Sequence, residues 1–288
     1  MSLNKISLGK FTVYGLRDGF FRLDGGAMFG VVPKVLWEKV YKPDSLNRIK
    51  LGLNSILIDT QDKLILVDTG IGKNLKKKIY DHYSVEREPG LVGALEQRGY
   101  SPDDIDFVIN THLHFDHCGG NTFMNQLGKF VPTFPHSQYV IQKGEWENAL
   151  DPGARDRPSY IKSAFLPLKE HGQLKLVEGD SPVTDGVFVM LTEGHTSSHQ
   201  IIKVESEGEI LYFLGDMIPT SSHVNLPYVM SYDLYPVKTL ENKEKFLKQA
   251  VENDWIIALN HDPEYFFGKI SKPGKKFEFS PLFDPNNS

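Results

Sequence analysis

The sequence predicts an α/β protein with a layered architecture, and three observations support this fold class. Short runs rich in β-branched and aromatic residues alternate with segments of helical periodicity. Residues that can bind metal ions come directly after several of the short runs, where loops held on a rigid sheet commonly carry chemistry. No internal repeat or low-complexity linker interrupts the 288 residues.

The first part of the chain contains strand, loop and hairpin patterns in succession. Residues 11–16 predict a strand, and the glycine-rich segment 24–34 predicts a shaped loop rather than a helix or strand. The β-rich runs 53–58 and 63–67 are separated by four polar residues, which predicts a hairpin. We expect a helix within 86–99 that ends near Gly99, then a turn at 101–104 and a buried strand at 105–110.

The second part continues the alternation of strands and helices. Strands are expected at 138–141, 187–191, 200–204 and 210–214, a helix at 242–252, and a last strand at 255–259. The basic run 73–78 is interpreted as a solvated helix face rather than a phosphate-binding patch.

Composition excludes several classes of protein. Hydrophobic residues make up 40% and charged residues 24%, which is ordinary for a soluble globular protein. No run approaches the roughly 18 apolar residues of a membrane helix, and residues 1–8 lack an apolar signal region, so we expect a cytoplasmic protein without a membrane partner. The net charge of -5 counts against nucleic acid as a partner. A single cysteine, Cys118, excludes an intrachain disulfide and a thiolate-rich zinc site, and we expect it to be a small packing residue.

Residues 111–120, THLHFDHCGG, concentrate metal-binding side chains directly after the expected strand 105–110. Alternate residues of an extended chain face the same side, so His112 and His114 can face one ion. Asp116 and His117 follow in the turn and can reach a second ion. A set of surface histidines is the alternative interpretation, but this spacing of three histidines and an aspartate rarely arises by chance.

Three further residues have the same chemistry and lie in loops. His195 lies in EGHTSSH, Asp216 follows the strand expected at 210–214, and His261 follows the strand expected at 255–259. Each alone is more often a hydrogen-bonded structural residue. Together with the first run they make a set of seven candidate ligands.

The order of these residues resembles the metallo-β-lactamase-fold superfamily, whose signature is H-x-H-x-D-H, then Gly-His, Gly-Asp and a final His. The resemblance spans about residues 53–262, and Val67 to Gly70 match a further family element. It implies a four-layer αβ/βα sandwich. We expect one such domain over residues 1–288, with a substrate or dimer loop at about 24–50.

The resemblance also implies a dinuclear metal site in which Asp216 bridges the two ions. The first ion would be held by His112, His114 and His195. The second would be held by Asp116, His117 and His261. Imidazole and carboxylate ligands without thiolate favour two Zn²⁺ ions, and iron, manganese and cobalt are the alternatives.

The expected reaction is hydrolysis by a hydroxide shared between the two metals. Asp116 is the candidate to orient this hydroxide and to pass a proton to the leaving group, so Asp116 and Asp216 are the predicted catalytic residues. Asp68 is expected to orient a ligand histidine from outside the first layer of ligands.

Local resemblances narrow the substrate. Asp216 differs from the cysteine ligand of dinuclear β-lactamases, and His114 differs from the glutamate of electron-transferring di-iron members. Residues 25–34, 145–147, 216–220 and 232–236 look like the branch of quorum-quenching N-acyl-homoserine lactonases and methyl parathion hydrolases. This resemblance implies lactone or ester hydrolysis, with phosphotriester cleavage as a side activity. One departure is Pro219, which stands where some lactonases place a pocket tyrosine.

Four residues are candidates for substrate contact: Met28, Phe29, Trp146 and His223. The alternatives are a dimer contact or loop packing for Met28 and Phe29, a core position for Trp146, and an exposed surface position for His223. The apolar residues of the 24–50 segment are compatible with a homodimer.

Three rival functions share the histidine signature or the metal site. They are a glyoxalase II-type thioesterase, a phosphodiesterase or nuclease, and a non-catalytic metal-stabilised binding protein. The acidic net charge counts against the nuclease, and retention of all seven candidate ligands counts against the binding protein. A small-molecule lactone or ester is therefore the expected partner.

Overall fold

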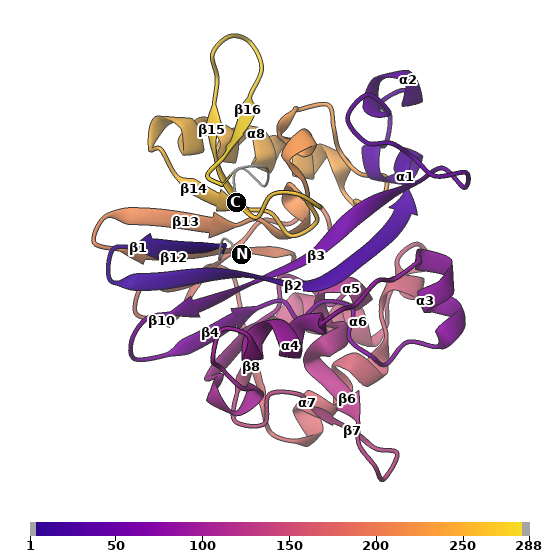
Figure 1. Ribbon diagram of the computed structural model, residues 1–288, viewed down its shortest axis with the longest axis vertical. Coiled ribbons are helices and arrows are strands. Elements are labelled where there is room, and N and C mark those ends of the chain that lie inside the picture. The colour runs from indigo at the N-terminus through magenta and orange to yellow at the C-terminus, as the bar shows by residue number, and fades with distance from the viewer. Residues whose placement is uncertain (1–3, 284–288) are drawn as a thin grey trace.

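The computed structural model describes residues 4–283 as two stacked β-sheets with helices on both outer faces (Figure 1). Residues 1–3 and 284–288, the ends of the expected domain, lie outside the described range. The predicted four-layer αβ/βα sandwich is confirmed.

The first sheet has the strand order β1-β2-β3-β4-β5-β8-β9. It pairs antiparallel from β1 to β4 and parallel from β4 to β9. Its strands are β1 (Lys5–Leu8), β2 (Phe11–Asp24), β3 (Arg48–Asp59), β4 (Leu64–Val67), β5 (Phe107–Ile109), β8 (Gln138–Gln142) and β9 (Leu174–Val177).

The second sheet runs in sequence order from β10 to β16, and only β13 and β14 pair parallel among its described strands. Its strands are β10 (Ser181–Thr184), β11 (Val187–Leu191), β12 (Gln200–Ser206), β13 (Glu209–Phe213), β14 (Ile256–Ala258), β15 (Phe267–Ser271) and β16 (Glu278–Pro281). A separate hairpin pairs β6 (Thr122–Met124) with β7 (Phe130–Pro132).

The helices divide between the two outer faces and the loops. Helix α8 (Pro236–Glu252) packs on the second sheet, while the first sheet is covered by helices that include α4 (Gly90–Glu96), α6 (Lys143–Leu150) and α7 (Leu166–Glu170) (Figure 1). The remaining α-helices are α1 (Gly25–Phe29), α2 (Lys34–Trp37), α3 (Lys77–Tyr83) and α5 (Phe115–Cys118). Short 3₁₀ turns include Pro102–Asp104, Gly215–Met217 and Ser221–Val224.

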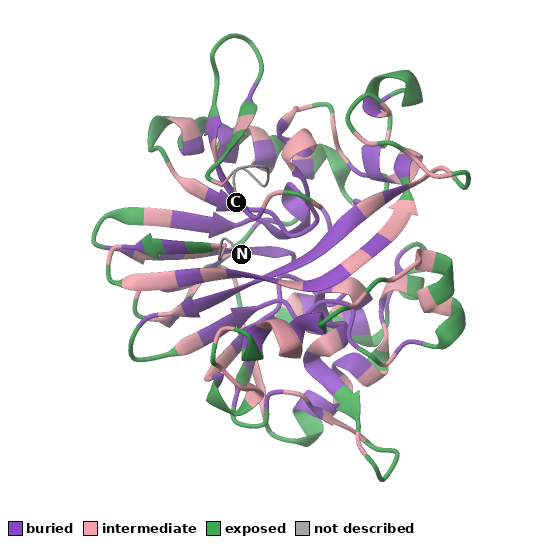
Figure 2. Ribbon diagram, in the orientation of Figure 1, coloured by how far each residue is buried: buried purple, intermediate pink, exposed green. Residues whose placement is uncertain are grey.

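The alternation of side chains along each strand explains the layers. In β4, Ile65 and Val67 lie in the core between the two sheets, whereas Leu66 faces the helices on the outer side. A strand that is apolar at successive positions can therefore be buried on both faces. Figure 2 shows this as buried residues along the central strands, with exposed residues mainly in the helices and turns.

The predicted hairpin at 53–67 and the strands at 138–141, 187–191, 200–204 and 210–214 are confirmed within one or two residues at most ends. Three predicted elements were too short or too long. Strand β2 runs on from the predicted 11–16 to Asp24, α4 begins only after Pro89, and α8 begins at Pro236, six residues before the predicted start. Proline suits the first turn of a helix because its missing N–H would have no partner there.

Two predictions were wrong. The segment 24–34 contains the helix α1, because the Asp24 side chain accepts a hydrogen bond from the Ala27 N–H at 2.9 Å, and Gly30 ends the helix at a φ of +57°. The strand at 255–259 is not the last, since β15 and β16 follow it.

Of the basic run 73–78, only Lys77 and Lys78 lie in a helix, although its lysines are exposed as expected.

No helix within residues 4–283 combines the length and the apolar character that a membrane span requires.

Candidate metal centre

The loops that carry the seven candidate ligands come from both sheets and meet at one edge of the sandwich. Residues 112–117 follow β5 of the first sheet, while His195, Asp216 and His261 follow β11, β13 and β14 of the second. Backbone hydrogen bonds join the loops, including Gln200 N–H to Thr111 O at 3.0 Å. The seven side chains are thereby brought into two groups of three, His112, His114 and His195, and Asp116, His117 and His261. A third group of His112, His117 and Asp216 joins them. Within each group, one nitrogen or oxygen atom of each residue lies within 4.8 Å of the others.

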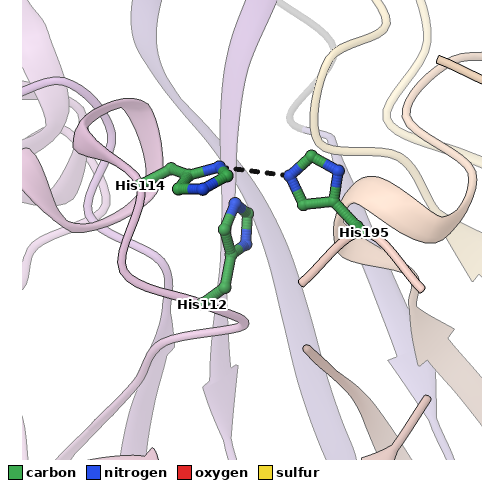
Figure 3. A group of neighbouring side chains, drawn as sticks. All are labelled: His112, His114 and His195. Carbon is green, nitrogen blue, oxygen red and sulfur yellow. Dashed lines mark hydrogen bonds between the residues drawn. The ribbon is translucent and has the colours of Figure 1, made fainter. Parts of the chain in front are cut away.

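The first group consists of three histidines, His112, His114 and His195. Figure 3 shows their rings turned toward one another. His114 Nδ1 and His195 Nε2 lie 3.1 Å apart. The ring of His112 lies 4.5 Å from that of His114 and 4.8 Å from that of His195, centre to centre. Three imidazoles converging in this way form a possible three-nitrogen site for one ion.

The second group consists of Asp116, His117 and His261. The Nε2 atoms of His117 and His261 lie 3.1 Å apart, and Asp116 Oδ2 lies 3.6 Å from His261 Nε2. Both rings are buried, while the Asp116 side chain keeps 11% of its surface exposed. The carboxylate of this group is thus the member that reaches solvent.

Asp216 lies between the two groups. One of its carboxylate oxygens is 3.1 Å from His195 Nε2, and the other is 3.4 Å from His117 Nε2 and 3.2 Å from His261 Nε2. This position matches that expected of a bridging ligand.

Each of three candidate ligand histidines has a fixed acceptor on its other ring nitrogen. His117 Nδ1 lies 2.8 Å from Asp68 Oδ2, His195 Nδ1 lies 2.8 Å from Asp233 Oδ1, and His261 Nδ1 lies 2.8 Å from Gly52 O. Acceptors at Nδ1 leave the Nε2 lone pair free to face a metal and set the direction of each ring. Asp68 therefore has the contact expected of an orienting residue.

His199 holds the backbone of Asp216. The Asp216 N–H donates to His199 Nε2 at 3.1 Å, so the proton of this imidazole resides on Nδ1, 2.7 Å from Thr192 Oγ1. Burial, with the nearby His195, lowers the pKa of His199 to about 3, which keeps the ring neutral. His199 thus links its own loop to the backbone of the loop that carries Asp216.

The electrostatics and the donor atoms fit divalent cations. Burial alone would lower the pKa of His117, but the carboxylates of Asp216 and Asp116 raise it well above the ordinary value. The surroundings of His117 therefore favour a positive charge. Burial holds the pKa of His112 well below its ordinary value, which leaves the ring neutral and its Nε2 lone pair available. This buried Nε2 has no hydrogen-bond partner among the described residues. A metal ion would supply the missing partner.

Gly119 and Gly120 permit a close approach of two backbone segments, and neither has a positive φ. A Cβ atom on Gly119 would lie 2.3 Å from Ile71 O, and one on Gly120 would lie 2.2 Å from Thr69 O. The two glycines therefore let the loop that carries residues 112–117 pack against residues 69–71.

Five of the seven candidate ligands line a cavity of about 180 Å³: His114, Asp116, His195, Asp216 and His261. We call the seven candidate ligands together the floor of this cavity. Its wall is mixed, with apolar side chains, two tyrosines and an arginine from segments far apart in sequence. The wall residues include Leu23, Met28, Tyr83, Phe115, Arg155, Met230 and Tyr232.

Of the four predicted substrate contacts, the structure brings only Met28 to this cavity. Phe29 is fully buried between Trp37 and His223, at ring distances of 5.6 and 4.9 Å. His223 is itself buried, with Nδ1 2.7 Å from Thr220 Oγ1 and Nε2 2.9 Å from Met28 O, so it supports the wall from behind. Trp146 packs in the core against Phe165. The predictions for Phe29, Trp146 and His223 were therefore wrong.

Sequence reasoning missed several residues around the site. Asp233 and Glu145 lie in stretches that resemble the lactonase branch, but the sequence offered no reason to single them out within those stretches. Asn260, whose Nδ2 donates to Asp216 Oδ1 at 2.8 Å, directly precedes a candidate ligand and could have been noticed. Arg155 and Tyr83 reach the wall from the 151–160 loop and from α3, which no local pattern indicates.

Comparison with known proteins identifies the family. The model of the Metallo-beta-lactamase superfamily matches residues 49–261, most of the chain. An N-acyl homoserine lactonase of Bacillus thuringiensis is 34% identical over 221 residues, which cover 72% of this chain and 80% of the lactonase. The chain therefore belongs to the metallo-β-lactamase superfamily.

Solved structures agree with this assignment. A probable metal-dependent hydrolase from Staphylococcus aureus superposes with a TM-score of 0.88 at 32% identity, covering 97% of this chain and 99% of that one. AidC, a dizinc quorum-quenching lactonase, superposes with a TM-score of 0.81 at 23% identity and 98% coverage of both chains, a likeness of fold alone. The prediction of a metal-dependent hydrolase is confirmed by the Bacillus thuringiensis lactonase and the Staphylococcus aureus hydrolase.

Proposed function

We propose that this member of the metallo-β-lactamase superfamily is a dinuclear metal-dependent hydrolase that opens N-acyl-homoserine lactones. The observation that carries the proposal is the convergence of five imidazoles and two carboxylates, and five of these seven groups line a cavity whose wall carries apolar side chains and tyrosines. The similarity to N-acyl homoserine lactonases over 72% of the chain supports the substrate class.

The two ions would be Zn²⁺, because imidazole and carboxylate donors without thiolate suit zinc. His112, His114 and His195 would hold the first ion, Asp116, His117 and His261 would hold the second, and Asp216 would bridge them. The chemistry that such a metal pair supplies when bound is polarisation of the substrate carbonyl and a lowered pKa of water.

The remaining steps fall to the side chains of the chain itself. The Asp116 carboxylate lines the cavity with 11% of its side chain exposed, against 8% for Asp216, so it can take a proton from the attacking water and return it to the departing alkoxide. Burial, together with the charge of Asp116, raises the pKa of Tyr83, which keeps this phenol protonated. Tyr83 and Tyr232, the two tyrosines of the wall, are thus the groups that would donate a hydrogen bond to the substrate where Pro219 cannot.

The wall would select the acyl group. Leu23, Met28, Phe115 and Met230 offer apolar surface for an acyl chain beside the candidate metal site. Arg155 also lines the cavity, and its guanidinium donates to Ser231 O and to Asp233 O. These two hydrogen bonds join the 151–160 loop to residues 231–233, and both segments would lie beside the bound substrate.

The test is hydrolysis of N-hexanoyl-homoserine lactone by zinc-loaded protein, followed by proton release and by mass spectrometry of the ring-opened product. We expect turnover that disappears in Asp216→Ala. A glutathione thioester and an aryl phosphotriester serve as rival substrates. Metal-loaded, folded protein that cleaves the thioester but opens no lactone would overturn the proposal in favour of the glyoxalase II-type thioesterase.

We also propose that the exposed apolar side chains between α1 and β3 form a homodimer contact. Val31, Val35 and Leu36 are 90%, 64% and 46% exposed, whereas Met28 and Phe29, the residues first considered for such a contact, are buried. Light scattering after size exclusion should give a dimer mass that Val31→Glu reduces to a monomer mass. A monomer mass for the unaltered protein would refute this contact.

A further inference from the structure

A buried carboxylate that the proposed reaction does not use lies directly behind the first histidine group. Glu145, near the start of α6, is 1% exposed and accepts three hydrogen bonds. The donors are Leu113 N–H at 2.9 Å, Tyr160 OH at 2.9 Å and Thr196 OH at 2.7 Å. A buried carboxylate is costly unless it is bonded in this way, so its presence calls for a reason.

The donors belong to the segments that carry the first histidine group. Leu113 is the residue between His112 and His114, and Thr196 directly follows His195. One segment extends from the first sheet and the other from the second. Oε1 binds the first segment and Oε2 the second, so one carboxylate connects the two loops at the residues next to the histidines.

The third donor reaches the ring of His114 itself. The Tyr160 ring lies 4.9 Å from the His114 ring at an interplanar angle of 68°, and the two residues form an isolated backbone bridge. Asn148 Nδ2 donates to the Tyr160 hydroxyl at 3.1 Å, which fixes the phenol from the other side. Because the phenol also donates to Glu145, the carboxylate sets the position of a ring that packs on His114.

We propose that Glu145 is a positioning residue that holds His112 and His114 in register with His195 for the first metal ion. Productive ligand geometry tolerates displacements of only about 0.5 Å, and residues outside the ligand layer supply that precision. Loss of the carboxylate would leave the Leu113 N–H and two hydroxyls without their acceptor and would free the two loops to separate. The inference rests on the proposed function only in taking the three histidines as metal ligands.

The test compares Glu145→Ala and Glu145→Gln with Glu147→Ala, an exposed glutamate on the same helix. Co²⁺ is titrated into metal-free protein, and its visible absorption and competition with a chelator give the affinity of each equivalent. We expect Glu145→Ala to weaken one equivalent by about 10- to 100-fold and alter its spectrum. Glu145→Gln retains an acceptor oxygen and should restore most of the affinity, and Glu147→Ala should match the unaltered protein.

Unchanged affinity and spectrum in Glu145→Ala, or an equal loss at both equivalents, would overturn the inference. If Glu145→Ala fails to fold, Thr196→Val removes a single donor, with Ser197→Ala in the same loop as its control. Thr196→Val should weaken one equivalent several-fold, and a result equal to that of Ser197→Ala would overturn the inference. These measurements use no lactone, so a protein that binds metal as expected but opens no lactone refutes the proposed function alone.

Discussion

The floor of the cavity and its wall are held in different ways. On the floor, the rings of His117, His195 and His261 each have a fixed acceptor on the nitrogen that faces away from the centre. The wall is assembled from β2, α1, α3, α5 and the loops around residues 155 and 231, and most of its side chains are apolar and are held by packing in one hydrophobic cluster. Changes to the floor should therefore affect metal binding, whereas changes to the wall should affect the choice of substrate.

The largest effect is expected from Asp216→Ala on the floor. Removing the carboxylate that lies between the two groups should abolish binding of one or both metal ions. The several kcal/mol of Lewis-acid stabilisation that is then lost corresponds to a fall of about 10³-fold in kcat/KM. Metal analysis and lactone hydrolysis measure the two losses. The exposed Asp151→Ala is the control, and full metal content in Asp216→Ala would contradict the assignment.

A smaller effect on the floor is expected from Asp233→Ala. This change removes the acceptor of His195 Nδ1, so the ring is no longer held toward the first ion. We expect metal affinity to fall by about 10- to 100-fold. Chelator competition measures it, with exposed Asp185→Ala as the control. An affinity equal to that of the control would show that the backbone alone orients His195.

On the wall, Met28→Ala should change specificity and leave the metals in place. The Met28 side chain lines the cavity beside the candidate ligands. Losing this apolar contact should lower kcat/KM for a long-chain acyl lactone by about tenfold, with a smaller change for a short-chain one. Met124→Ala, on the exposed hairpin, serves as the control. Equal losses for both chain lengths would place the acyl chain elsewhere.

The smallest catalytic effect is expected behind the wall, from His223→Ala. The change leaves Met28 O and Thr220 Oγ1 without a partner and should cost about 1–3 kcal/mol of unfolding free energy. Denaturant unfolding of the metal-free protein measures this loss, with exposed His171→Ala as the control. A large fall in kcat with unchanged stability would return His223 to the list of substrate contacts.

His223 also gives the unfolding free energy a predicted pH dependence. Burial lowers its pKa from 6.5 to about 3, so between these values the unfolded chain binds a proton that the folded chain does not. The stability of the unaltered metal-free protein should therefore fall as pH drops below 6.5, by up to about 1.4 kcal/mol per pH unit from this residue. The His223→Ala variant should lack that contribution, and parallel curves for the two proteins would contradict it.

Motifs on the floor were recognisable because their residues are close in sequence or follow strands. His112 to His117 form one run, and Asp216 and His261 each come soon after a strand, so their positions could be predicted before their contacts were known. Phe29 and Trp146 were mistaken for pocket residues because an aromatic residue in a loop or short helix has the same local pattern whether it faces a cavity or the core. His223 was mistaken because its buried acceptor, Met28 O, is 195 residues away.

The sequence by itself determined the strand alternation, the identity and order of the seven candidate ligands, and the family to which the chain belongs. These features depend on local periodicity and on residue type, which can be observed along the chain. Only the tertiary structure decided that Asp233 and Gly52 O lie against the outer nitrogens of His195 and His261, that Glu145 joins the loops from two sheets, and which side chains form the wall. Such contacts join residues tens to hundreds of positions apart, and their partners are chosen by the stacking of the two sheets.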